Sequence, residues 1–80
     1  MHPEQIKQLI LAGMVCDHLE LDGDGQHFQA IVVSPEFVGK NRVQRQQRVN
    51  QILRDKFDSG ELHALSFKTL TPEEWSAQRG

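Results

Sequence analysis

The sequence has little of what marks several large classes of protein. It contains one cysteine, Cys16, and no tyrosine among 80 residues. A single cysteine excludes an internal disulfide and a zinc site built from paired cysteines, so we expect a reducing, cytoplasmic setting. No apolar run approaches the roughly 18 residues that span a membrane, and the amino-terminal residues lack the order of a secretory signal. We therefore expect no membrane partner.

Motifs of the common enzyme classes are also missing. The sequence has no glycine-rich phosphate loop of the required spacing, and no nucleophile stands beside a base at a recognisable spacing. Cys16 and His18 are too close together, and too common a pair, to indicate a metal site by themselves. We therefore predict that the protein is not an enzyme.

The charged residues that are present are distributed unevenly along a chain whose length predicts one domain, residues 1–80. Six of the nine Lys and Arg residues lie between positions 40 and 56, with only one of the eleven Asp and Glu residues. This segment has a net charge of +5, against −7 for the remainder. The contrast predicts a surface for an anionic or acidic partner. The alternative is an ordinary solvated helix, because Arg, Lys and Gln are good helix formers.

Apolar residues at three- and four-residue steps predict four helical segments. The first covers residues 3–12. The next two lie within Ser34–Phe57, as a helix, a tight turn at Gly39 and a longer basic helix. One face of that longer helix is expected to carry Val43, Val49, Ile52, Leu53 and Phe57. The last helix begins at a capping box on Thr71 and should hold Trp75 near the core.

Alternating residues predict three strands: one within 15–21 that starts close to Asp17, one at 27–33 and one at 63–68. In the first strand Val15 is expected to face the apolar side and Cys16 the opposite side. The segment Asp22–Gly25 has the composition of a hairpin turn. The second strand is apolar on both faces and should be central, with the third strand parallel to it. The order α-β-β-α-α-β-α predicts an α+β fold with a three-stranded mixed sheet.

Three stretches of the sequence resemble the BolA family, in the same order and over about residues 4–78. They are GDGQHFQAIVVS, RVQRQQRVNQIL and HALSFKTLTPEEW. The short hairpin turn is most similar to the IbaG-type bacterial members of that family. The resemblance implies a BolA-like fold, related to the type II KH domain and containing a helix-turn-helix, which agrees with the order of elements derived above.

This resemblance implies an adaptor that shares a [2Fe–2S] cluster with a monothiol glutaredoxin and glutathione. The family's histidine ligand at the start of the third strand is matched by His63, and imidazole is an established cluster ligand. Where many relatives place a second ligand in a longer loop, this chain has only a compact turn. His27 is the nearest imidazole there, and Asp24 is a poorer donor for iron–sulfur iron. The plain alternatives are a His63 packed beside Leu65 and Phe67, and a solvated His27.

The resemblance also implies a second activity, nucleic-acid binding through the helix-turn-helix. The surface predicted to bind the nucleic acid consists of Lys40, Arg42, Arg45 and Arg48. The same surface could instead bind an acidic protein partner. The net charge of −2 does not favour a dedicated DNA-binding protein. The turn Gly39–Arg42 also lacks the second glycine of a GXXG clamp. The sequence therefore favours the adaptor, and it leaves a homodimer open.

Overall fold

The computed structural model describes residues 1–24 and 27–79, which form one three-stranded sheet covered by helices. Strand β2, His27–Val33, pairs antiparallel with β1, His18–Gly23, and parallel with β3, Ala64–Leu70. The sheet order is β1-β2-β3. The predicted mixed sheet, with its second strand at the centre and its third strand parallel to it, is confirmed.

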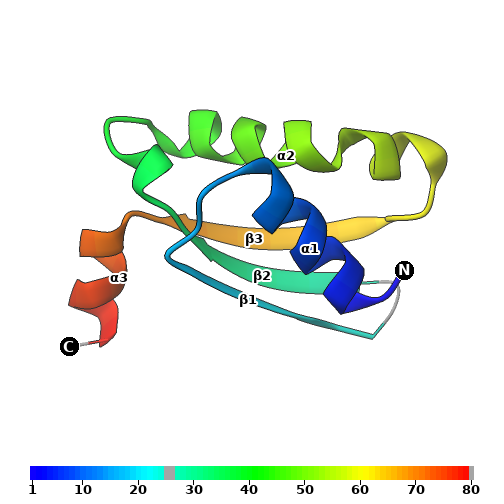
Figure 1. Ribbon diagram of the computed structural model, residues 1–80, viewed down its shortest axis with the longest axis horizontal. Coiled ribbons are helices and arrows are strands. Elements are labelled where there is room, and N and C mark those ends of the chain that lie inside the picture. The colour runs from blue at the N-terminus through cyan, green and yellow to red at the C-terminus, as the bar shows by residue number, and fades with distance from the viewer. Residues whose placement is uncertain (25–26, 80) are drawn as a thin grey trace.

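Two helices cover one face of the sheet and leave the other face open (Figure 1). They are α1, Pro3–Gly13, and α2, Arg42–Ser59. The short helix α3, Pro72–Arg79, lies at one end of the sheet, at the carboxyl end of β3. Among the described helices there is none with the length and apolar character to cross a membrane.

The core lies between the two long helices and β2. Alternation along β2 turns Phe28, Ala30 and Val32 toward the helices. The fully buried apolar side chains from the other elements are Ile6, Ile10, Phe37, Val49 and Leu53. These contacts supply the hydrophobic stabilisation that a chain of 80 residues needs, because so small a domain buries only about 60% of its unfolded surface.

Local capping chemistry sets the ends of α2 and α3. Asn41 and Gln44 form a capping box at the start of α2, and Gly60 ends the helix in the left-handed conformation with φ of 81°. The capping box predicted for α3 is confirmed. Thr71 N donates to Glu74 Oε1 at 2.7 Å, and Glu74 N donates to Thr71 Oγ1 at 3.2 Å.

The structure corrects the predicted helical pair in two respects. Its first member is a single turn of 3₁₀-helix, η1, Pro35–Phe37, because only three residues lie between the cap at Ser34 and the residues that lead into the Gly39 turn. Val43 does not share the apolar face of α2 and is 62% exposed. It precedes Val49 by six residues, which is about one and two-thirds helical turns, so the two side chains diverge.

The structure confirms that the first strand starts close to Asp17, and it corrects the predicted facing of the two residues before Asp17. β1 begins at His18, and the preceding residues form a connection in which Val15 is 62% exposed while Cys16 packs against the core. The Val15 N–H donates to Glu36 and the Val15 carbonyl accepts from Ser34, so its backbone does not pair with a neighbouring strand. Val15 therefore faces solvent and Cys16 faces the core, which is the reverse of the prediction. Asp22 and Gly23, predicted in the turn, belong to β1, and the predicted turn residue Gly25 lies outside the described residues.

A polar cluster ties this connection to η1 and α2. The Glu36 carboxylate accepts from Val15 N at 2.6 Å and from Arg48 Nε at 3.4 Å. Arg48 Nη2 also donates to Gly13 O at 2.8 Å. The Val15 N–H holds the pKa of Glu36 below its ordinary value, against the opposing effect of partial burial, and the Arg48 charge lowers it further.

This cluster predicts a dependence of stability on acid pH. A carboxylate with a lowered folded-state pKa contributes stability that is complete above its unfolded pKa of about 4.3 and is lost as pH falls through the folded value. We expect Glu36→Gln to be less stable than wild type at pH 7, with the difference shrinking below about pH 4.3. Urea unfolding between pH 7 and pH 3 measures this. The exposed Asp55→Asn is the control, and a difference independent of pH would contradict the assignment.

Candidate functional site

His63 is exposed, but its backbone is fixed on both sides. The preceding residue, Leu62, is buried in the core, and its N–H donates to Lys56 O at 3.1 Å. The following residue, Ala64, begins β3. The imidazole makes no hydrogen bond or ion pair with any residue in 1–24 or 27–79. This combination of an anchored backbone and an uncommitted ring suits a ligand offered to another molecule.

His27 lies beside His63 at the same end of the sheet. It is the first residue of β2, and its register partner on β3 is Ala64, the residue that follows His63. Its side chain is 76% exposed, and its ring Nδ1 lies 3.9 Å from Asp24 Oδ2. Asp24 also accepts from His27 N at 2.8 Å. The backbones of His27 and His63 thus lie at the same end of the sheet, but their side chains and that of Asp24 do not form a three-ligand metal group.

The four predicted cations of the partner surface lie at the other end of α2. Lys40 and Arg42 are exposed at the start of the helix, and Arg45 and Arg48 follow in its first two turns. His63 comes after the helix has ended. An 18-residue helix is about 27 Å long, so the basic residues and the histidines form two separate surfaces.

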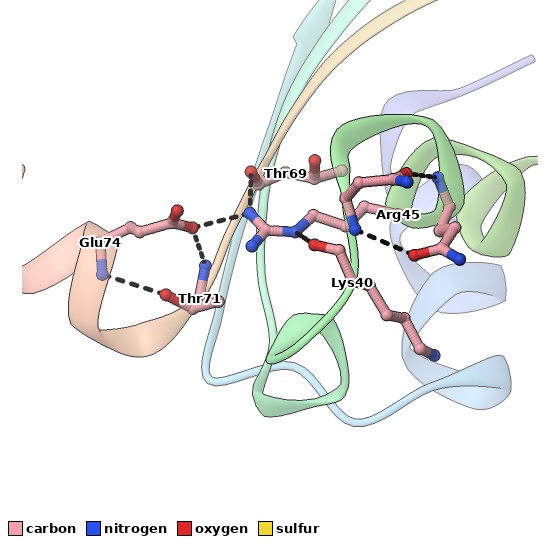
Figure 2. Close-up of polar contacts among 7 residues, drawn as sticks. Lys40, Arg45, Thr69, Thr71 and Glu74 are labelled. Atoms are coloured by element: carbon pink, nitrogen blue, oxygen red, sulfur yellow. Dashed lines mark hydrogen bonds and ion pairs between the residues drawn. The ribbon is translucent and has the colours of Figure 1, made fainter.

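Arg45 is tied into the fold rather than presented to a partner. Figure 2 shows its guanidinium between α2, β3 and α3. Its Nε donates to Lys40 O at 2.9 Å, and its Nη1 donates to Glu74 Oε1 at 2.7 Å and Thr69 O at 3.4 Å. The side chain is only 15% exposed. With Arg48 engaged by Glu36, Lys40 and Arg42 are the exposed members of the predicted set.

Sequence reasoning missed a ring stack on the open face of the sheet. The His18 and Trp75 rings lie 4.6 Å apart between centroids, at an interplanar angle of 19°. His18 Nε2 is also 2.8 Å from Glu20 Oε2. Trp75 was expected near the core, but α3 is short and contributes no buried residue, so its tryptophan packs on β1 instead. Alternation along β1 indicates the face of His18, but no local signal indicates a contact 57 positions away.

Cys16 is the only thiol, and its surroundings favour the protonated form. Burial raises the pKa of the Cys16 thiol, and the carboxylates of Glu36 and Asp17 raise it further. The thiolate is the nucleophile and the metal ligand, so this setting reduces both reactivities. Within the described parts of the chain, no group of three or more His, Cys, Asp or Glu side chains lies close enough together to hold a metal ion.

Comparison with known proteins places the chain in a family. The model of the BolA-like protein family matches residues 12–74. The chain belongs to the BolA family. The acid stress protein IbaG of Escherichia coli is 34% identical to it over 79 residues, which cover 99% of this chain and 94% of that protein.

Two further similarities within the BolA family bear on fold and function. The DNA-binding transcriptional regulator BolA of Haemophilus influenzae is 41% identical over 56 residues, covering 70% of this chain and 53% of that protein. A crystal structure of a Bol-like protein from Babesia bovis has a TM-score of 0.86 at 26% identity, covering 100% of this chain and 95% of that chain. The predicted BolA-like α+β fold is therefore confirmed. The Escherichia coli and Haemophilus influenzae relatives are named as a stress protein and a regulator, not as enzymes.

The contacts of Arg45 predict that it stabilises the fold whereas Arg42 does not. We expect Arg45→Ala to lower the free energy of unfolding by about 1–3 kcal/mol, because it removes the charge-assisted bond to Glu74 and the side-chain donor to the Thr69 carbonyl. The exposed Arg42→Ala should change it by less than about 0.5 kcal/mol. Urea unfolding followed by Trp75 fluorescence measures both. Equal effects from the two variants would contradict a structural role for Arg45.

Proposed function

We propose that this BolA-family chain is a non-enzymatic adaptor that shares a [2Fe–2S] cluster with a monothiol glutaredoxin and glutathione. In this role it transfers the cluster or senses iron supply in the cytoplasm. The observation that supports the proposal best is His63, an exposed imidazole with a fixed backbone and no partner among the described residues. The glutaredoxin itself is inferred from the family resemblance.

The chemistry of the donor set fits a shared cluster. A histidine in place of a thiolate lowers the negative charge on the cluster and raises its reduction potential. This chain is assigned one or two of the ligands, His63 and its neighbour His27, and the glutaredoxin and glutathione thiolates supply the rest.

Replacing each histidine tests the ligand assignment. The chain is mixed with a monothiol glutaredoxin, glutathione and reconstituted cluster, and visible circular dichroism is recorded. We expect His63→Ala to abolish the change that the wild-type chain produces, and His27→Ala to alter the bands. His2→Asn is the matched control, because asparagine keeps the helix cap that His2 provides for α1.

The possible results of this experiment distinguish an error in the ligand assignment from an error in the proposed adaptor function. A spectrum for His63→Ala identical to that of wild type would remove His63 from the ligand set. If the wild-type chain itself leaves the glutaredoxin spectrum unchanged at every ratio, the adaptor function is wrong. A change seen only with His27→Ala would keep the adaptor and reassign its ligand.

Nucleic-acid binding is the second candidate, favoured by the exposed Lys40 and Arg42 and by the name of the Haemophilus influenzae relative, a DNA-binding transcriptional regulator. Two observations weigh against it. Arg45 and Arg48 are engaged within the chain, and the first helix of the expected helix-turn-helix is one 3₁₀ turn. This leaves few cations for phosphate contacts.

A salt-dependent gel shift tests this candidate. We expect any DNA complex to be nonspecific and to disappear by about 0.15 M salt, because few phosphates are neutralised. The double variant Lys40→Glu, Arg42→Glu should abolish it, and Arg54→Glu on the same helix is the control. A sequence-specific complex that survives about 0.15 M salt would favour a transcriptional regulator.

A further inference from the structure

β3 is an edge strand, and one hydrogen bond fixes which of its peptide groups are unpaired. Ser34 N donates to Leu70 O at 3.0 Å, so the peptide groups of Leu70 face β2. Peptide groups alternate in direction along a strand. Leu65, Phe67 and Thr69 therefore direct theirs to the free edge, and the bond from Arg45 to the Thr69 carbonyl agrees with this assignment.

The free edge has an unused central portion. Arg45 occupies the Thr69 carbonyl, but the outward N–H and C=O groups of Leu65 and Phe67 have no partner within residues 1–24 and 27–79. The side chains of these two residues are only partly buried where they pack against the core. An edge of this kind is a template for another strand unless it is covered.

A hollow of about 470 Å³ beside this edge is positively charged. Its lining residues are Arg42, Arg45, Phe67, Lys68, Thr69 and Leu70. Three of them are cations and none is a carboxylate. Glu74 neutralises Arg45, which leaves Arg42 and Lys68 to attract an anionic occupant.

We propose that the free edge of β3 binds an extended acidic peptide segment of a partner protein as a fourth strand. Its backbone pairs with Leu65 and Phe67, its apolar side chains cover their exposed flank, and its carboxylates approach Arg42 and Lys68. Strand addition obtains affinity from main-chain hydrogen bonds and specificity from alternate side chains. The proposal does not depend on cluster binding, because none of these residues is a proposed ligand.

The charges and the backbone groups together select this occupant. A nucleic acid complements Arg42 and Lys68, but it has no regular row of N–H and C=O groups to match the edge. A second copy of this chain that pairs through its own β3 has such a row, but it brings another Lys68 and another Arg42 to the same place. Only an acidic strand satisfies both features.

A peptide titration with residue-specific detection tests the proposal. The probe is an eight-residue peptide of alternating Val and Glu, added to the ¹⁵N-labelled full chain. We expect amide hydrogen exchange to slow at Leu65 and Phe67, and to stay unchanged at Ser66, whose N–H faces β2. A Glu-Pro repeat of equal length and charge cannot pair as a strand and should give no protection.

Charge variants provide the second arm. Arg42→Glu and Lys68→Glu should each weaken binding of the Val-Glu peptide several-fold, whereas Arg54→Glu, with the same charge change on α2, should leave it unchanged. Equal binding of the Glu-Pro peptide, or no protection of Leu65 and Phe67, overturns the proposal. It is also overturned if an eight-residue oligothymidylate produces the same protection, or if protection rises with protein concentration alone.

Discussion

The contact between Arg45 and Glu74 is the interaction on which the arrangement of the carboxyl-terminal half depends. One guanidinium joins the turn before α2 to the end of β3 and the start of α3, through bonds to residues 24 and 29 positions after Arg45. Glu74 serves twice, because the same carboxylate oxygen accepts from the Thr71 N–H and from Arg45. A charge-assisted bond at 2.7 Å with little solvent around the arginine is stronger than an exposed ion pair.

Because of this contact, the carboxyl end of β3 is anchored to other elements, whereas its amino end lies beside an exposed residue. At its carboxyl end the strand is fixed by Arg45 and by pairing with the residue after β2. At its amino end the strand follows His63, an exposed residue close to the hairpin end of β2. The anchored end keeps the strand in register with β2, and that register holds His63 beside His27. The position of the candidate ligands therefore rests on contacts made a strand length away.

The sequence was sufficient for features that neighbouring residues decide. The central position of the second strand follows from its apolar residues on both faces, and the parallel third strand from the helices that connect the two. The Thr71 capping box follows from short-range chemistry. The sequence did not reveal the role of Arg45, because its contacts reach residues 24 and 29 positions away. The predicted orientation of Val15 and Cys16 was wrong for the same reason. Ser34 and Glu36, which are distant in the sequence, bond to the backbone of Val15 in the connection before β1.

The same distant contacts change the meaning of the charge pattern. A net charge of +5 in residues 40–56 indicates an anion-binding helix only if the cations are free to reach an anion. In the folded chain Arg45 and Arg48 face carboxylates from other elements, and Lys56 pairs with Glu61 at 2.9 Å. Much of the local excess of positive charge is thus neutralised by acids that lie outside residues 40–56. The remaining positive surface is narrow and lies beside an open strand edge, which suits a short acidic peptide better than the extended backbone of a nucleic acid.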